Sequence, residues 1–498
     1  MATGTRRCHI VLRSSINLFP YLPALLCLLL LFWQVTPASA GEPSPTLEQI
    51  GEIGKIEEAG TTSSTVGASL REASDALQLQ ISGEISHDFA LKLDDGETLA
   101  NQTSYRLSFE SQLAENARAH ISWKGSYDLV NGEWDLATLD EAYVDVYLAG
   151  ADIRAGRQAI SWGTADGFNP TSFVSPNKAL SLASGEPGNV SDLGDLSDLK
   201  GEPVLACQAT IYPAWGDITG VAVIEPALLP APLPQDAQAQ IIYGASVSLA
   251  QQLNRKVLPV AMTFPEPHGP SGIGENLEIA CRVHTQVGSW DVYGNAFRGW
   301  EPVPALWMAT TSNLDANTPV GLVPEARYRK ATKLGIATAG ALDRYTLWVE
   351  AAYTWPDAIP ELDNPRNIAL SSNRGYAQVV LGGDCSFDND IYASAQLIYN
   401  SEGSILNPYL LRGQEQLSGY YAAGTIRYTG DNGDNRLELT GLGNLRDGSL
   451  ALVPRYTHKL AQPVELSTGL VAFVGKDGTE FGDLRRNGMV FSGVKVSF

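Results

Sequence analysis

The chain has 498 residues, with 34 Lys and Arg against 55 Asp and Glu, so its formal net charge is −21 at pH 7. Nucleic acid is an unsuitable partner for so acidic a protein, because phosphate backbones are bound mainly by Lys and Arg. Beyond the first 40 residues, no stretch holds the roughly 20 consecutive apolar residues that a membrane-spanning helix requires.

The first 40 residues have the pattern of a secretory signal peptide. Three arginines precede an apolar stretch at 22–32, and Ala38-Ser39-Ala40 places small residues where a signal peptidase cleaves. The alternative is an uncleaved membrane anchor. Cleavage after Ala40 would remove three basic and no acidic residues, which leaves 458 residues with a net charge of −24.

Residues 41–75 form a leader before the first predicted strand. Leu47, Ile50, Ile53 and Ile56 have helix-like spacing among acidic residues. A short periplasmic helix, a plug and a disordered leader are all compatible with this pattern. We favour a solvated leader.

From residue 76 onwards, apolar and polar residues alternate over runs of about ten positions. Leu77, Leu79 and Ile81, for example, alternate with Gln78 and Gln80. Successive side chains of a strand point to opposite faces, so this pattern predicts strands with one apolar face. We expect about eighteen strands (16–18), at 76–91, 103–114, 116–129, 138–149, 151–161, 203–213, 217–225, 276–287, 288–300, 327–341, 343–355, 374–386, 390–400, 417–429, 434–445, 449–459, 463–474 and 487–498.

The predicted connections alternate in length along the chain. Tight turns fall near 115, 150, 215, 287, 342, 388, 431 and 461. Longer connections fall between them, at 92–102, 130–137, 162–202, 226–275, 301–326, 356–373, 401–416 and 475–486, and only the one at 446–448 breaks the rule. Short periplasmic turns and long extracellular loops are typical of outer-membrane barrels. The sequence therefore predicts an all-β protein, a transmembrane antiparallel up-and-down β-barrel over 76–498.

Residues for catalysis or metal binding are sparse. The cysteines after the signal peptide are Cys207, Cys281 and Cys385, an odd number that argues against a disulfide framework or a metal-ligand cluster. No nucleophile elbow or His-x-x-x-His motif accompanies the histidines after the signal peptide, which are His87, His120, His268, His284 and His458. We expect neither an enzyme nor a cofactor.

Several short motifs resemble those of a porin-like outer-membrane family. Residues 156–163 read Gly-Arg-Gln-Ala-Ile-Ser-Trp-Gly, Asn169-Pro170 follows, and the closing stretch 481–498 is also similar. This family is distantly similar to alginate-export-type barrels. The resemblance implies a barrel, a pore, and contact with outer-membrane lipid and lipopolysaccharide. It also implies that the terminal Phe498 is read by the barrel assembly machinery. Residues 226–275 fit the family pattern poorly.

Strand parity assigns one face of each strand to lipid and the other to the interior. Charges belong inside, because a Lys or Arg at the lipid midplane costs roughly 2–4 kcal/mol. The pore-lining residues predicted in this way include Arg106, Arg118, Lys124, Arg282, Arg344, Glu350 and Arg427. This basic set would draw anions. The alternative is pairing within the wall, for example between Arg344 and Glu350.

Connection 162–202 is the predicted constriction, by analogy with porins in which a long loop folds inward. Arg154 and Arg157 precede it, and a bulge at Gly156 would turn both inward. The acidic residues expected opposite them are Asp166, Glu186, Asp192, Asp195 and Asp198. The alternative is an acidic surface loop that binds divalent cations among lipopolysaccharide phosphates. The spacing of these acids does not match a calcium-binding loop, so no metal site is predicted.

Three functions fit this sequence, and all place the protein in the bacterial outer membrane. We favour a porin-like channel for passive or weakly selective passage of small hydrophilic solutes. The second is a dedicated exporter or importer of one polymer or hydrophobic compound. The third is a non-conducting assembly or anchoring barrel in which 41–75 binds a periplasmic partner. A homo-oligomer would require a flat apolar patch on the outer surface.

Overall fold

A computed structural model describes residues 78–175, 201–231, 233, 235–270, 272–311, 319–406, 409, 419–430 and 433–498. The expected signal peptide and leader lie outside the described residues, as do four acidic residues of the predicted constriction, Glu186, Asp192, Asp195 and Asp198.

Eighteen of the described strands form one antiparallel sheet, as the alternation pattern predicts. They are β1 (Gln80–Lys92), β2 (Thr98–Ala114), β3 (Ala117–Asp128), β4 (Glu133–Leu148), β5 (Ala151–Gln158), β6 (Val204–Ile211), β7 (Gly216–Glu225), β9 (Glu278–Val287), β10 (Trp290–Trp300), β13 (Lys330–Leu342), β14 (Tyr345–Pro356), β16 (Tyr376–Phe387), β17 (Ile391–Asn400), β18 (Gly419–Gly430), β19 (Asn435–Asn444), β20 (Ser449–Ala461), β21 (Val464–Val474) and β22 (Met489–Ser497).

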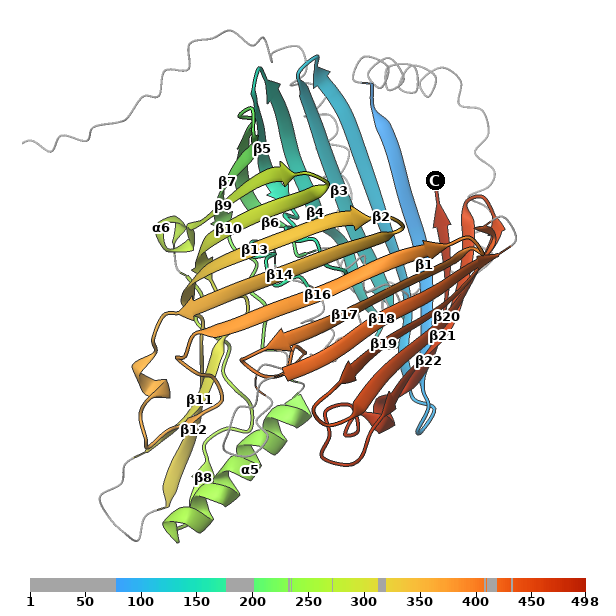
Figure 1. Cartoon of the computed structure of the whole chain (residues 1–498). Coiled ribbons are helices and arrows are strands. Elements are labelled where there is room, and N and C mark those ends of the chain that lie inside the picture. The colour runs from blue at the N-terminus through green and yellow to red at the C-terminus, as the bar shows by residue number, and fades with distance from the viewer. Residues whose placement is uncertain are drawn as a thin grey trace, which may run out of the picture. The chain divides into compact units, whose positions relative to one another are not determined.

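The sheet closes on itself (Figure 1). Each strand pairs with the next barrel strand along the chain, and β22 pairs with β1 from Glu84 opposite Ser497 to Lys92 opposite Met489. Backbone hydrogen bonds of 2.9 Å in both directions between Gly83 and Phe498 complete this ladder. A closed sheet satisfies the backbone groups of every strand without an exposed edge, which a hydrocarbon environment requires.

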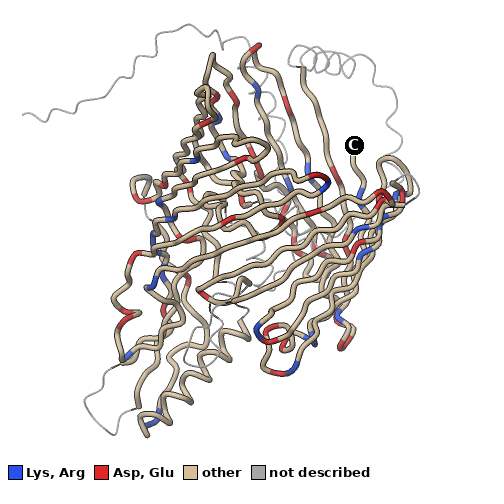
Figure 2. Tube along the Cα trace, in the orientation of Figure 1, with Lys and Arg blue, Asp and Glu red and all other residues tan. Residues whose placement is uncertain are grey.

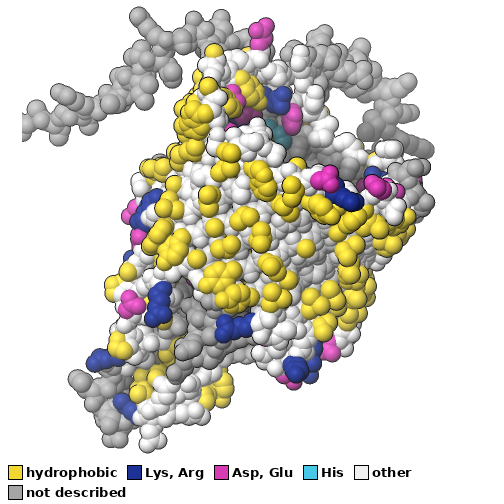
Figure 3. Space-filling model, viewed as in Figure 1, with side chains coloured by type: hydrophobic (Ala, Val, Ile, Leu, Met, Phe, Trp, Pro, Cys, Tyr) yellow, Lys and Arg dark blue, Asp and Glu magenta, His cyan; other side chains and the backbone are white. Residues whose placement is uncertain are grey.

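The two faces of the wall differ as period-two alternation requires. Large apolar side chains such as Leu397 of β17 and Leu381 of β16 point outward and are more than half exposed. Hydrophobic side chains dominate the visible wall in Figure 3, and charged ones lie mainly at its margins. Positions on the other parity carry polar groups, such as the Thr425 and Thr440 hydroxyls, 3.0 Å apart.

Short and long connections are sorted to opposite rims. On the rim near the start of β1 and the end of β22, consecutive strands are joined by two to four residues. The connections on the other rim range from four residues to the 52 between β7 and β9. The short connection between β19 and β20 falls on this second rim, where the sequence pattern places it.

Three of the long connections, those after β7, β10 and β14, contain strands in segments that the sequence analysis treats as loop. A second sheet, the accessory sheet, has the order β15-β11-β12-β8 and lies beyond the ends of β10, β13 and β14 (Figure 1). Its elements and their neighbours are α5 (Gln235–Leu253), β8 (Val257–Pro259), α6 (Ile273–Asn276), β11 (Ala305–Thr310), β12 (Val320–Arg327), η3 (Pro360–Leu362) and β15 (Ile368–Ala369), and η5 (Arg485–Asn487) precedes β22.

Helix α5 packs on the accessory sheet. Ile242 of the helix is fully buried in a cluster with Leu306 and Met308 of β11 and Leu322 of β12. Within the described part of the chain, no helix is both long and apolar enough to cross a membrane.

We expect Leu397→Arg to destabilise the barrel by roughly 2–4 kcal/mol, because the substitution puts a cation on the lipid-facing side of β17. Urea unfolding of the protein refolded into lipid vesicles measures this loss. The control is Ser82→Arg, which puts the same side chain on the inner face of β1, opposite Ser108. Equal losses in the two variants would contradict the assignment of the faces.

Candidate functional site in the barrel interior

Residues 159–175, here called the inner segment, follow β5 and are anchored by one carboxylate. Glu350 of β14 is fully buried. One of its oxygens accepts the backbone N–H of Thr164 and, at 2.8 Å, that of Ala165. The other accepts the Thr171 hydroxyl at 2.8 Å and the Thr171 N–H at 3.3 Å. We call this set of contacts the Glu350 latch.

The inner segment also binds β17, through Asp166. The Asp166 carbonyl accepts a hydrogen bond of 2.6 Å from the side-chain amide of Gln396. The Tyr392 hydroxyl donates to the Asp166 carboxylate at 3.3 Å. Asp166, predicted as an acidic partner of Arg154 and Arg157, therefore contacts β17.

Apolar side chains of the inner segment pack on several strands. Trp162 and Phe173 belong to one buried cluster with residues of β6, β7, β9, β10 and β14. Ala165 belongs to a second cluster with Trp348 of β14 and Tyr421 of β18. These strands lie around much of the barrel, so the inner segment occupies part of its interior.

Cations on the inner face of β2 and β3 share one carboxylate. Lys124 lies 2.9 Å from Asp140 of β4, and Arg106 lies 3.4 Å from the same carboxyl group. Arg106 also lies 3.7 Å from Glu84 of β1. A register shift between Ser122 and Trp123 in the β3–β4 ladder accompanies this arrangement. The pairing distributes the basic charge among acidic neighbours.

Arg154 is paired with the residue directly across the ladder. Its Nε and one terminal nitrogen bind the two oxygens of Asp145 at 2.6 and 3.0 Å, a two-pronged geometry that suits guanidinium and carboxylate. The guanidinium also lies 4.1 Å from the ring centre of Tyr143. Arg154 therefore has its countercharge within the wall.

No bulge occurs at Gly156, so that interpretation of the sequence is wrong. The β4–β5 and β5–β6 ladders pass through this residue without a register shift. Its φ of 137° suits glycine, and a Cβ there would lie 2.1 Å from the Ala142 carbonyl oxygen. Arg157 donates from Nε to the backbone carbonyl of Asp140 at 3.2 Å.

The predicted pairing of Arg344 with Glu350 is also wrong. Arg344 lies in the two-residue turn between β13 and β14, is exposed, and has its guanidinium 5.9 Å from the ring of Tyr345. A residue at the tip of a hairpin follows the turn conformation, so alternation along the strand does not predict its direction.

The other cations that were predicted to line the pore, Arg427, Arg282 and Arg118, have different neighbours. Arg427 of β18 forms an ion pair with Glu438 of β19. Arg282 of β9 lies 5.6 Å from the ring of Trp162 in the inner segment. Arg118 is exposed near the short-turn rim. Acidic and basic positions are interspersed along the wall (Figure 2), and among the described residues no three His, Cys, Asp or Glu converge as a metal site would require.

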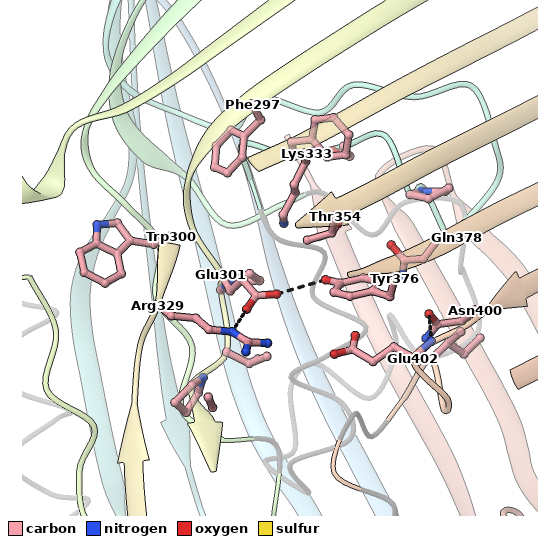
Figure 4. Close-up of a pocket in the computed structure, with 18 of the residues that line it drawn as sticks. Phe297, Trp300, Glu301, Arg329, Lys333, Thr354, Tyr376, Gln378, Asn400 and Glu402 are labelled. Atoms are coloured by element: carbon pink, nitrogen blue, oxygen red, sulfur yellow. Dashed lines mark hydrogen bonds and ion pairs between the residues drawn. The ribbon is translucent and has the colours of Figure 1, made fainter. Parts of the chain in front are cut away.

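A cavity that the sequence analysis did not predict lies beside the inner segment (Figure 4). Its volume is about 170 Å³. Arg329 and Glu301 form a buried ion pair on its wall, and the Tyr376 hydroxyl donates to the same carboxylate at 3.2 Å. Arg329 also donates to the carbonyl of Ser372 at 2.8 Å. These residues come from strand ends and connections, where the alternation pattern carries no information.

The chain has been compared with known proteins. No family model and no curated protein matches it. Among solved structures, OccK5 (OpdH) of Pseudomonas aeruginosa is 8% identical with a TM-score of 0.46, over 84% of this chain and 97% of that chain. OmpF of Salmonella typhi, in a complex with daunomycin, is 9% identical with a TM-score of 0.40, over 84% and 97%. A mutant of the Rh. blastica porin is 12% identical with a TM-score of 0.37, over 84% and 100%. The description of this chain as a closed barrel follows from its own strand pairing.

Proposed function

We propose that this protein is a porin-like channel of the bacterial outer membrane that lets small hydrophilic solutes pass passively with weak selectivity. The observation that carries the proposal is the closed barrel of 18 strands, apolar outside and polar inside. Barrels of 16 to 18 strands are wide enough to enclose an aqueous channel. Lipid and lipopolysaccharide would cover the outer face, and the assembly machinery would read Phe498.

The paired charges of the inner wall support weak selectivity. Arg106, Lys124 and Arg154 each lie within 4 Å of a carboxylate on a neighbouring strand. Paired charges project a weaker field into the bore than isolated ones, because their contributions largely cancel beyond a few ångströms. Arg157 and Arg282 have no carboxylate at that distance among the described residues, so we expect only a slight preference for anions.

The inner segment supports a constricted pore. Its hydrogen bonds to β14 and β17 fix it to the inner side of the wall. In this proposal the inner segment sets the narrowest point of the bore, and solutes pass beside it.

Single-channel recording of the refolded protein in planar bilayers tests the channel. We expect stepwise conductance that is ohmic in salt. Block by one solute class alone would favour a dedicated exporter or importer. Silence from protein whose heat-modifiable gel migration shows correct folding would overturn the proposal and favour an assembly or anchoring barrel. Cross-linking in membranes would show whether the channel is a homo-oligomer.

We expect Asp140→Asn to shift ion preference towards anions, because Arg106 and Lys124 then lose the carboxylate that they share. The reversal potential across a KCl gradient measures this shift. Asp477→Asn is the control, because Asp477 is 90% exposed in the connection before β22, where it pairs with Arg485. An unchanged reversal potential in Asp140→Asn would show that these charges do not face the conducting path.

A further inference from the structure

The cavity beside the inner segment has the size and the lining of a ligand site. Strands β10, β13, β14 and β16, residues 168–174 and connection 401–405 all contribute to its wall. A volume of about 170 Å³ exceeds the roughly 150 Å³ that suffices to hold benzene. The rings of Phe297, Trp300 and Tyr376 line part of it (Figure 4).

Lys333 of β13 brings an ammonium group to this cavity. Its side chain is only 9% exposed and points towards Glu301 and Thr354 in Figure 4. The amine lies 5.4 Å from the ring centre of Phe297 and 5.9 Å from that of Phe173. No described carboxylate lies within 4 Å of it. Glu278, Glu301 and Glu402 attract the ammonium group only from a longer distance. A buried ammonium group with no carboxylate in contact is costly, so a ligand carboxylate that contacts it would be bound favourably.

Glu402 brings a carboxylate from the connection after β17. Its backbone N–H donates to the Asn400 side chain at 3.2 Å, but no described residue donates a hydrogen bond to its carboxylate. Burial, reinforced by the negative charge of Glu301, raises the pKa of Glu402, although Arg329 and Lys333 oppose this. Arg329 is already held by Glu301 and Ser372.

We propose that this cavity binds a small zwitterion, an α-amino acid with an apolar side chain, during passage through the channel. Lys333 would bind its carboxylate and Glu402 its ammonium group, and the aromatic rings would contact its side chain. A zwitterion satisfies both groups at once, whereas an anion or a cation leaves one of them without an ionic partner. The inference rests on the proposed channel for its role in transport, but binding itself does not require conduction.

Isothermal titration of the refolded full chain in detergent tests the site with three probes of the same shape. They are L-leucine, 4-methylpentanoate, which lacks the ammonium group, and 3-methylbutylamine, which lacks the carboxylate. We expect leucine to bind at least about tenfold more tightly than either analogue, equivalent to about 1.4 kcal/mol. Equal affinities for the three, or no binding of leucine by folded protein, would overturn the proposal.

Lys333→Met and Glu402→Gln should each weaken leucine binding at least about tenfold. Lys459→Met and Glu465→Gln are matched controls from a pair outside the cavity, near a short turn, and they should bind leucine as the parent chain does. If either cavity variant misfolds, the comparison of leucine with its two analogues on the parent chain still tests the proposed site. Leucine binding without conductance would overturn the channel alone, and conductance without leucine binding would overturn this site alone.

The affinity for leucine should rise from about pH 6 to about pH 8. The raised pKa of Glu402 leaves its carboxyl partly protonated near neutral pH, and only the ionised form binds an ammonium ion. The other ionisable groups of the cavity wall are Glu278, Glu301, Arg329, Lys333, Tyr376 and Tyr409. In Glu402→Gln the affinity for leucine should not change over this pH range. If it rises as much as in the parent chain, then a group other than Glu402 causes the pH dependence.

Discussion

Glu350→Ala should raise the conductance of the channel and make its current noisier. The substitution removes the acceptor for the backbone N–H groups of Thr164, Ala165 and Thr171. Each buried donor left without a partner costs about 1–3 kcal/mol, so the inner segment would move to reach water. Once detached from β14, it would no longer hold a fixed position in the bore. Single-channel recording measures the conductance and its variance.

Two further variants sharpen this test. Glu350→Gln keeps the size of the side chain but replaces one acceptor oxygen with an NH₂ donor facing N–H groups, so its effect should lie between those of the parent and alanine. Thr346→Ala changes an exposed inner-face residue of the same strand and should leave the conductance unchanged. Parent-like conductance and protease resistance in Glu350→Ala would show that the latch does not hold the inner segment.

The barrel could be predicted from the sequence because lipid imposes a strict pattern on its strands. In β22, Val490, Val494 and Val496 lie on one face and Lys495 on the other, and the ladders to β1 and β21 run through all of them. One apolar face per strand is a physical requirement of a hydrocarbon environment, so alternation recurs in every strand. The lengths of the connections follow directly from the strand boundaries.

The accessory sheet could not be predicted in this way. Residues 305–310 of β11 are apolar at most positions, and four of the six are buried. A strand covered on both faces has no alternation and reads the same as an apolar loop. Helix α5 could not be predicted for a similar reason. Small residues such as Ala245 and Ala250 pack in the same cluster as its buried Ile242, so the apolar spacing typical of a helix is hard to recognise in the sequence.

The charged residues of the interior could be predicted only where side chains alternate strictly between the two faces of a strand. Alternation assigns Arg106 and Lys124 to one face, and the structure places both beside Asp140. The register shift in the β3–β4 ladder brings Asp140 to them, and a shift of this kind has no signature in the sequence of one strand. The cavity depends on contacts between distant connections, such as that of Arg329 with Ser372. Such contacts form only once the barrel has closed, so no pattern in a short stretch of sequence predicts them.

Arg329→Met should destabilise the protein by about 3–5 kcal/mol, the usual cost of removing one partner from a buried ion pair. The guanidinium is 5% exposed and the carboxylate of Glu301 is 9% exposed, so water cannot replace the lost partner. Glu301 would then share the cavity with Glu402, and among the described residues its one remaining donor would be the hydroxyl of Tyr376. Urea unfolding in vesicles measures the change.

The double variant Arg329→Met/Glu301→Gln separates the cost of an unpaired charge from the cost of lost packing. The amide that replaces the Glu301 carboxylate would be neutral and could still accept from the Tyr376 hydroxyl, so most of the lost stability should return. Replacing a whole buried pair is often neutral, whereas breaking one is not. If the double variant is as unstable as Arg329→Met, then the loss comes from the shape of the Arg329 side chain and its bond to Ser372. In that case the electrostatic description of this cavity wall would be wrong. Leucine binding would then have to be measured again in both variants, because it requires Lys333 and Glu402 to be charged beside a pair, Arg329 and Glu301, that has no net charge.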